Sequence, residues 1–280
     1  MISVRAALAR GAAQLQHLTN ARRDAELLMM HTLGCDRAWL LTHSDALLTA
    51  EQAALYERLI VRRARHEPIQ YIVGEQEFYG LKFRVTPDVL IPRPETEHLV
   101  EALLPRVPHD VPLRIADIGT GSGAIAVALA HLLRQAQITA LDISPAALAV
   151  AQGNAAQNNV AEGIRFVESD LLAAVAGETF DAIVSNPPYV AASEILEPQV
   201  RDFEPAGALF AGATGLEIYR RLIPQAHAAL NADGWLLLEI GDGQRDAIHQ
   251  LLAGWSNVSF VADLQGIPRV ACAQRSGREP

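Results

Sequence analysis

Cysteine is almost absent from this sequence. Its 280 residues include two, Cys35 and Cys272, which stand far apart with no paired spacing. This excludes a disulfide framework and a zinc site built on cysteine pairs. The nine histidines are scattered along the chain, so they form no recognisable set of metal ligands, and we expect no metal.

Long hydrophobic runs are lacking as well. No uninterrupted apolar stretch reaches about 18 residues, and the first residues, 1–5, lack the charged and apolar sections of a signal peptide. We therefore expect a cytoplasmic protein that contacts no membrane. Because half of the residues are apolar, the chain should bury a full α/β core and still have room for a smaller second domain.

An excess of positive charge is also missing. The net charge of −9 disfavours a protein whose main task is to grip duplex DNA, so we expect no stable nucleic-acid binding. One basic cluster, Arg58, Arg62, Arg63 and Arg65, lies near the end of an expected helix, where cations complement the helix dipole. Its plainer interpretation is a solvated helix face, and the alternative is a docking surface for RNA or for a protein that mimics RNA.

The residue pattern divides the chain into three segments. Residues 1–67 carry helical periodicity and predict a small helical bundle. In residues 68–92, two short strand-like runs, 69–74 and 81–85, are separated by glycines and predict a β-hairpin that links two domains. Residues 93–280 alternate between strand and helix, which predicts parallel βαβ units with helices on both faces of the sheet.

The third segment predicts the fold class, which is α/β with a Rossmann-like, seven-stranded and mostly parallel sheet. The last two expected strands, 258–263 and 269–274, are joined by a link too short for a crossover helix, so they predict a terminal antiparallel hairpin. The other expected strands are 113–117, 137–142, 164–168, 180–185 and 235–240, and helices are expected near 123–134, 144–158, 217–230 and 244–253.

Four residues, Asn186-Pro187-Pro188-Tyr189, carry the strongest chemical signal. They follow an expected buried strand, and the side-chain carbonyl of Asn186 and the main-chain carbonyl of Pro187 provide two acceptors close together. Such a pair suits an NH2 group, and the ring of Tyr189 can pack flat against the planar group that carries it. The plainer interpretation is a proline-rich turn, but the position of these residues relative to a glycine-rich loop favours a functional site.

That loop follows the first expected strand and opens a helix, so a ligand can approach its backbone at a helix N-terminus. Asp142, at the end of the second strand, has the spacing of the acid that binds ribose hydroxyls in nucleotide-binding folds, although it could merely cap a helix. The G-x-G-x-G spacing is tighter than that of dehydrogenases and favours S-adenosylmethionine. The loop contributes Gly119, Thr120, Gly121, Ser122 and Gly123.

Two further residues are expected beside the adenine of this cofactor. Asp170 and Leu171 come just after the third strand, where the carboxylate of Asp170 can accept from an exocyclic amine and Leu171 can supply apolar contact. Asn186 is expected to border the cofactor as well as the substrate.

Together these residues resemble the class I S-adenosylmethionine-dependent methyltransferases with an Asn-Pro-Pro-Tyr motif, which methylate planar amino groups. The chain as a whole is similar to one family of that group, the release factor glutamine methyltransferases (HemK/PrmC). Leu171 and Pro268 depart from the pattern, because Leu171 replaces an aromatic residue of some relatives and Pro268 interrupts a turn. The similarity includes Gln70-Tyr71-Ile72, Gly74, Phe78-Tyr79-Gly80, residues 91–97 and Phe203-Glu204-Pro205.

The resemblance implies transfer of a methyl group from S-adenosylmethionine, with S-adenosylhomocysteine as product, to the side-chain nitrogen (N5) of the glutamine in the Gly-Gly-Gln motif of peptide chain release factors. The catalytic residues would be Asn186, Pro187 and Tyr189, with Pro188 also contacting the substrate. The first segment would dock the release factor, Glu95, Thr96 and Phe203 could line the entrance, and we expect a monomer. Two alternatives stay open: a glutamine methyltransferase that acts on a ribosomal protein, and an adenine-N6 DNA methyltransferase, which the acidic charge disfavours.

Overall fold

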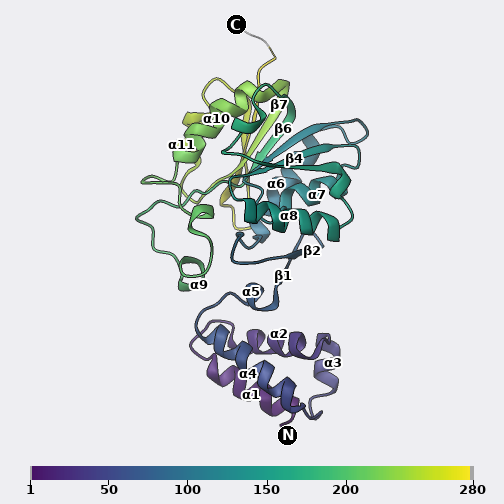
Figure 1. Ribbon diagram of the computed structural model, residues 1–280. Helices are drawn as coiled ribbons and strands as arrows, with labels where there is room; N and C mark the ends of the chain where they lie inside the picture. The colour runs from purple at the N-terminus through teal and green to yellow at the C-terminus, as the bar shows by residue number, and fades with distance from the viewer. Residues whose placement is uncertain (1, 278–280) are drawn as a thin grey trace. The chain divides into compact units, whose positions relative to one another are not determined.

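The computed structural model describes residues 2–277 as two compact units (Figure 1). Residues 278–280, which end the expected third segment, and residue 1 lie outside the described part of the chain. The helical unit contains the chain up to Gly74 together with Leu196–Phe203. The sheet unit contains Glu75–Ile195 and the chain from Glu204 onward.

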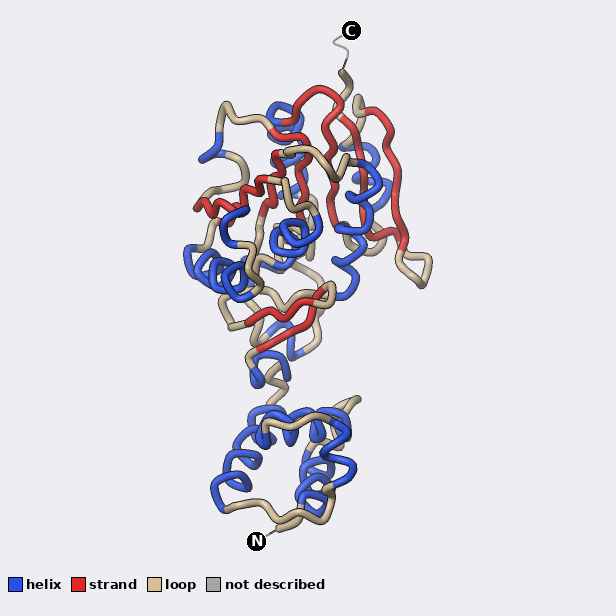
Figure 2. The backbone as a smooth tube through the Cα atoms, turned by 90° about the vertical axis from the view of Figure 1, so that its right-hand side faces the viewer, coloured by secondary structure: helices blue, strands red, loops and turns tan. Residues whose placement is uncertain are grey.

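Helices joined by short loops form the helical unit, as Figure 2 shows in blue. Local capping explains where several of them begin: the Ser3 side chain accepts from the Ala6 backbone, and Thr49 and Gln52 form a reciprocal capping box. The apolar faces of the helices then bury a shared core that includes Leu28, Met29 and Ile60. The helices that share this core are α1 (Val4–Gln14), α2 (Ala21–Leu33), α3 (Arg37–Thr42), α4 (Ala50–Ala64) and α5 (Ile69–Val73). The short helix α9 (Pro198–Arg201) also belongs to this unit but has no buried residue.

The prediction of a strand over residues 69–74 is wrong, because these residues form α5. The amides of Tyr71 and Ile72 both donate to the carbonyl of Pro68, and Gly74 ends the helix in the left-handed region at φ +81°. Ile69, Ile72 and Val73 pack against the helical core. Ile72 and Val73 follow Ile69 by three and four positions, so the three side chains share one face of a helix. A short apolar run fits either structure, and burial against neighbouring helices decided this one.

The arginine cluster does not form one solvated surface. Arg63 is buried, with 8% of its surface exposed, and its Nε lies 2.7 Å from Oδ2 of the equally buried Asp24. Its Nη1 donates to the carbonyl of Glu67, and Arg62 pairs with the carboxylate of that residue. The exposed members of the cluster are Arg58, Arg62 and Arg65.

We expect the Arg63→Met substitution to lower the free energy of unfolding of the helical unit by about 3 kcal/mol, because it leaves the Asp24 carboxylate buried without its partner. Hydrogen exchange of the α2 and α4 amides measures this loss in the full chain. Arg58→Met, at an exposed position of the same helix, is the matched control. The double variant Asp24→Leu/Arg63→Met should recover most of the stability. If Arg63→Met and Arg58→Met lowered the stability equally, a structural role for the Arg63–Asp24 pair would be contradicted.

The sheet unit is built on a seven-stranded sheet, as the sequence predicts. Its order is β5-β4-β3-β6-β7-β9-β8, with parallel pairing from β5 to β7 and antiparallel pairing of β9 with both neighbours. The expected terminal hairpin is therefore confirmed. The strands are β3 (Arg114–Ile118), β4 (Gln137–Asp142), β5 (Ile164–Glu168), β6 (Phe180–Ser185), β7 (Leu230–Glu239), β8 (Ser256–Ala262) and β9 (Pro268–Gln274).

Helices cover both faces of this sheet (Figures 1 and 2). Alternate residues of the central strands enter different cores: Ile115 and Val184 pack against one layer of helices, and Ala116 and Ile183 against the other. On the first face lie α6 (Glu97–Leu103), α7 (Ala124–Leu132) and α8 (Pro145–Gln157), and on the second lie α10 (Glu217–Ala229) and α11 (Arg245–Leu251).

A two-stranded hairpin begins the sheet unit. It pairs β1 (Glu75–Phe78) with β2 (Leu81–Arg84), so the predicted hairpin exists but its first strand starts later than expected. Its two turn residues, Tyr79 and Gly80, both have positive φ, of 53° and 72°, which is the type I′ geometry that matches the twist of the strands. Pro268, the second departure noted above, is the first residue of β9, a position where a strand tolerates a missing N–H.

Candidate functional site

A cavity of about 420 Å³ lies at the carboxyl ends of β3, β4 and β6. The chain order of the strands reverses between β3 and β6, and ligands bind preferentially at such a switch point in an open α/β sheet. The hydroxyl of Ser185 donates to the carbonyl of Ile118 at 2.7 Å and ties the two strand ends together. Every residue of the predicted glycine-rich loop except Gly123 lines this cavity, and so do Asp142, Asp170, Leu171, Asn186, Pro187 and Pro188.

Backbone hydrogen bonds to the end of β4 fix the glycine-rich loop beside the cavity. The amides of Gly119 and Thr120 both donate to the carbonyl of Leu141, at 2.8 and 2.9 Å. Gly123 adopts φ +81° where α7 begins, and a Cβ there would lie 3.0 Å from that of Ala151. This position therefore requires glycine on two grounds, the left-handed backbone and the close approach of α8.

Asp142 is bound to the backbone through both oxygens. Its Oδ2 accepts from Gly121 N at 2.8 Å and its Oδ1 from Ser144 N at 2.9 Å. Ser144 is the residue that caps α8, since its hydroxyl accepts from Ala147 N. Each carboxylate oxygen can accept more than one hydrogen bond, so Asp142 keeps acceptor capacity toward the cavity.

Asp170 and Leu171 also line the cavity. Asp170 is half-exposed and pairs with Arg221, which also lines the cavity. Leu171 has φ +54°, which is unusual for a residue other than glycine, and packs partly against the second core. A strained backbone at a cavity wall is a reason to look for function there.

Asn186 and Pro187 both line the cavity. Asn186 Nδ2 donates to the hydroxyl oxygen of Thr96 at 3.0 Å, so its Oδ1 is on the other side of the amide. Thr96 is 4% exposed and also lines the cavity. Of the other residues expected at the entrance, Phe203 belongs to the helical unit, and Glu95 is not among the described residues that line the cavity.

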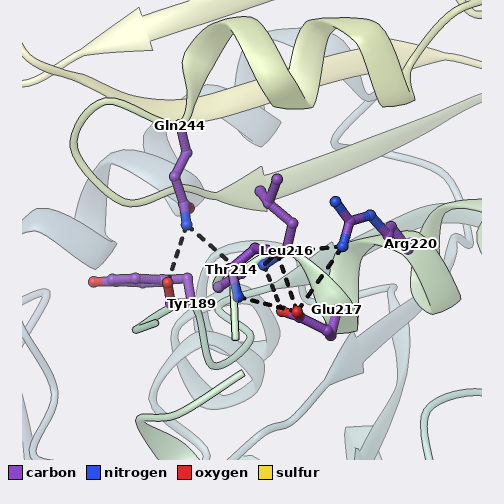
Figure 3. A network of polar contacts seen from close by, with 7 residues as sticks. Tyr189, Thr214, Leu216, Glu217, Arg220 and Gln244 are labelled. Atoms are coloured by element: carbon purple, nitrogen blue, oxygen red, sulfur yellow. Dashed lines mark hydrogen bonds and ion pairs between the residues drawn. The ribbon is translucent and has the colours of Figure 1, made fainter. Parts of the chain in front are cut away.

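Tyr189 does not belong to the described lining of the cavity, unlike the three residues before it. It is half-buried against the second core, and its hydroxyl donates to Glu239 Oε1 at 3.3 Å. Gln244 holds its backbone, because Nε2 donates to the carbonyls of Tyr189 and Gly215 at 3.0 and 3.4 Å (Figure 3). The position of Tyr189 is thus set by the loop after β6, the loop before α10 and the start of α11.

Two buried carboxyl groups that hydrogen-bond to predicted site residues, Thr120 and Tyr189, were not themselves predicted as site residues. Asp117 and Glu239 are 0% and 2% exposed, and each has one oxygen, Oδ1 and Oε2, with no hydrogen-bond partner among residues 2–277. Burial raises the pKa of each to about 7. An acidic residue inside an apolar strand is the signal that could have identified both.

The Asp117→Asn substitution should change how stability depends on pH. The native state binds the Asp117 proton more tightly than the unfolded state, whose pKa is near 4, so this residue lowers the stability of the wild type as pH rises from about 4 to about 7. The variant lacks this loss of stability, which amounts to about 4 kcal/mol when the pKa rises from about 4 to about 7 on folding.

Chemical denaturation at pH 5 and pH 8 measures the difference, with the exposed Asp110→Asn as control. Parallel curves for Asp117→Asn and the wild type would show that the carboxyl group does not titrate in this range. Glu239 has a shift of the same sign, so part of the pH dependence should persist in the variant.

Within residues 2–277, no helix has both the length and the apolar character needed to cross a membrane. In the same part of the chain, no three His, Cys, Asp or Glu side chains lie together as metal ligands would.

Two family profiles match the chain. The PrmC N-terminal domain matches residues 6–74, and the methyltransferase small domain matches residues 95–204. The first match ends at the last residue of the helical unit's main segment, Gly74.

Curated proteins with the name release factor glutamine methyltransferase are similar along nearly the whole chain. The protein of Koribacter versatilis is 48% identical over 95% of this chain and 96% of its own length. Those of Geobacter sulfurreducens and Escherichia coli are 43% and 42% identical, over 90% and 92% of this chain and 88% and 93% of their own.

Solved structures of methyltransferases share the fold. A methyltransferase from Pyrococcus furiosus aligns with a TM-score of 0.54 at 19% identity, over 71% of this chain and 90% of its own. The T. thermophilus 16S rRNA N2 G1207 methyltransferase, solved with AdoMet and guanosine, aligns at 0.55 and 20% identity, over 72% of this chain and 49% of its own.

Proposed function

Since the chain belongs to the family of release factor glutamine methyltransferases, we propose that it methylates the side-chain nitrogen (N5) of the glutamine in the Gly-Gly-Gln motif of peptide chain release factors, with S-adenosylmethionine as methyl donor. One observation supports this most directly. The Nδ2 group of Asn186 donates to Thr96, so its Oδ1 remains available as an acceptor, and Asn186 and Pro187 line the same cavity as the glycine-rich loop.

The cavity fits S-adenosylmethionine. The open side of the loop has room for a ligand, since a Cβ at Gly119 would have no atom within 4 Å, and one at Gly121 would be 4.0 Å from the nearest. Asp142 retains acceptor capacity suited to ribose hydroxyls, and Leu171 offers apolar contact for a base. The proposed cofactor-binding residues are Gly119, Thr120, Gly121, Ser122, Gly123, Asp142, Asp170, Leu171 and Asn186.

The chain's own residues act mainly by positioning. An amide nitrogen is a poor nucleophile because its lone pair is delocalised, so its two hydrogens must be held while the nitrogen faces the methyl group. Asn186 Oδ1 and the Pro187 carbonyl accept these hydrogens, and their dipoles stabilise the positive charge that develops on the nitrogen. When bound, S-adenosylmethionine supplies an electrophilic methyl group, and the proton can leave the nitrogen after transfer.

Tyr189 and Pro188 complete the proposed substrate site. Burial raises the pKa of the Tyr189 hydroxyl, so this group stays protonated and keeps its hydrogen bond to Glu239. With its hydroxyl directed to Glu239, Tyr189 can offer only the exposed part of its ring to the amide plane. We also propose that the helical unit binds the body of the release factor, leaving the sheet unit to hold the glutamine.

A methylation assay with labelled S-adenosylmethionine tests the substrate. We expect label on a release factor and none on a variant of that factor in which the Gly-Gly-Gln glutamine is replaced by alanine. Labelling of a ribosomal protein or of DNA, with the release factor left unlabelled, would contradict the proposal and favour the corresponding alternative.

A further inference from the structure

Helix α10 is fixed to the sheet along one row of its side chains. Tyr219, Leu222 and Ala226 are each 0% exposed and belong to the second core. The hydroxyl of Tyr219 also donates to the main-chain carbonyl of Glu239 at 2.7 Å, which ties the helix to the last residue of β7. Since the helix is anchored in this way, a segment bound to its other side chains is held in a defined place.

A second row of the same helix meets the cavity and the segment that follows β5. Arg221 Nη2 donates to Asp170 Oδ2 at 2.5 Å, and Gln225 Oε1 accepts from the amide of Leu172 at 3.1 Å. Ile218 and Arg221 themselves line the cavity. Because positions 218, 221 and 225 are three and four residues apart, their side chains share one face of α10. This face therefore binds both ends of the segment 170–172.

The middle residue of that segment, Leu171, needs such support. Its φ of +54° is unfavourable for a residue with a side chain, so the segment would relax to another conformation if its two ends were released. The Arg221–Asp170 pair is half-exposed on both sides, and ion pairs of this kind contribute little to the stability of a whole domain. Its effect is therefore local, and it falls on the part of the cavity wall that Asp170 and Leu171 form.

We propose that Arg221 and Gln225 are positioning residues that hold Asp170 and Leu171 in place to bind a purine with an amino group at C6, which is the base of S-adenosylmethionine. With Arg221 bound to Oδ2, Asp170 keeps Oδ1 as an acceptor for that amino group. An ionised carboxylate can only accept, so a base with a carbonyl oxygen at C6 is rejected. The rejection requires a fixed carboxylate, because a mobile one can turn away from the wrong base. This inference rests on the proposed function for the identity of the cofactor.

Binding of S-adenosylhomocysteine, measured by calorimetry, is the first test. Arg221→Met removes the charge and the donors, and should raise the dissociation constant about tenfold, as for one lost hydrogen bond to a charged group. Gln225→Met should raise it about fivefold, as for one neutral hydrogen bond. Arg220→Met is the matched control, because Arg220 is the next residue of the same helix and pairs with Glu217 (Figure 3), but does not line the cavity among the described residues. Its dissociation constant should stay within about twofold of the wild type, as expected for an exposed ion pair.

The choice between two bases separates positioning from a general loss of structure. S-inosylhomocysteine carries a carbonyl oxygen in place of the C6 amino group, and should bind to the wild type about a hundredfold more weakly than S-adenosylhomocysteine. In Arg221→Met this ratio should fall to about tenfold, because the released carboxylate no longer penalises the wrong base. Arg221→Lys keeps the charge and should retain most of the discrimination. A general loosening of the cavity would weaken both ligands alike, so an unchanged ratio in Arg221→Met would overturn the proposal.

A further measurement needs neither substrate nor cofactor. The amide of Leu172 should be protected from hydrogen exchange in the wild type and in Arg220→Met, and should lose protection in Gln225→Met, which removes its acceptor. If protection is the same in all three proteins, Gln225 does not hold the segment and the proposal is wrong. If the binding and exchange patterns appear but no release factor is methylated, the proposed function fails while the role of α10 stands. If the release factor is methylated but Arg221→Met binds both ligands as Arg220→Met does, only this inference fails.

Discussion

Replacing Asn186 with alanine should abolish methyl transfer while binding of S-adenosylmethionine is partly retained. The substitution removes the oxygen proposed to hold one hydrogen of the substrate amide and to stabilise the charge developing on its nitrogen. Loss of one such preorganised group costs about 10³-fold in kcat. The cavity keeps the glycine-rich loop and Asp142, so the cofactor dissociation constant should rise only about fivefold, as for one lost hydrogen bond.

Turnover with saturating release factor and calorimetry with the cofactor measure the two effects separately. Asn158→Ala is the matched control, because that residue also donates hydrogen bonds, to the carbonyls of Lys82 and Asn154, but does not line the cavity among the described residues. It should retain near-normal kcat. Normal turnover of Asn186→Ala would refute the role proposed for its oxygen.

Gly215→Ala should be among the most damaging substitutions in the sheet unit. Gly215 has φ +75°, and a Cβ there would lie 2.4 Å from the carbonyl oxygen of Tyr189 and 2.9 Å from Nε2 of Gln244. The clash falls on backbone that is fixed by Gln244 (Figure 3), so it cannot be relieved by a side-chain rotation. We expect a loss of about 4 kcal/mol in the free energy of unfolding, from backbone strain and overpacking together.

Because the clash displaces Tyr189, activity should also fall, under conditions where the variant is still folded. Denaturation and kcat, measured on the same preparation, test both effects. Gly254→Ala separates the two causes of instability: Gly254 has φ +89°, but a Cβ there meets nothing within 4 Å. This control should lose about 1 kcal/mol from strain alone. Equal losses of stability in Gly215→Ala and Gly254→Ala would show that the contact of the added Cβ with the Tyr189 carbonyl is unimportant.

Some elements could be predicted nearly to the residue, and others could not. The strands at 137–142 and 180–185 were predicted with the bounds observed for β4 and β6, because apolar runs between turn residues leave little choice. The run at 69–74 was equally apolar but is helical, since it packs on the helical core. β7 begins at Leu230, ahead of the predicted 235, where Asn231, Asp233 and Gly234 hide the strand pattern.

The functional site likewise has parts that the sequence predicts and parts that it does not. Asn186, Pro187, Asp142 and the glycine-rich loop line one cavity because each follows a parallel strand, and the carboxyl ends of those strands meet at one edge. The expectation for Tyr189 was incomplete, because sequence could not show that its hydroxyl meets Glu239.

The sequence alone determined the fold class, the family resemblance and the two motifs of the site, because these depend on local periodicity and on spacing along the chain. Only the tertiary structure decided which polar or charged side chain pairs with which partner. Arg63 and Asp24, or Asn186 and Thr96, are 39 and 90 positions apart, and only packing brings them within hydrogen-bond distance. A buried polar group must find a partner wherever the fold supplies one, and no local pattern of residues states where that is.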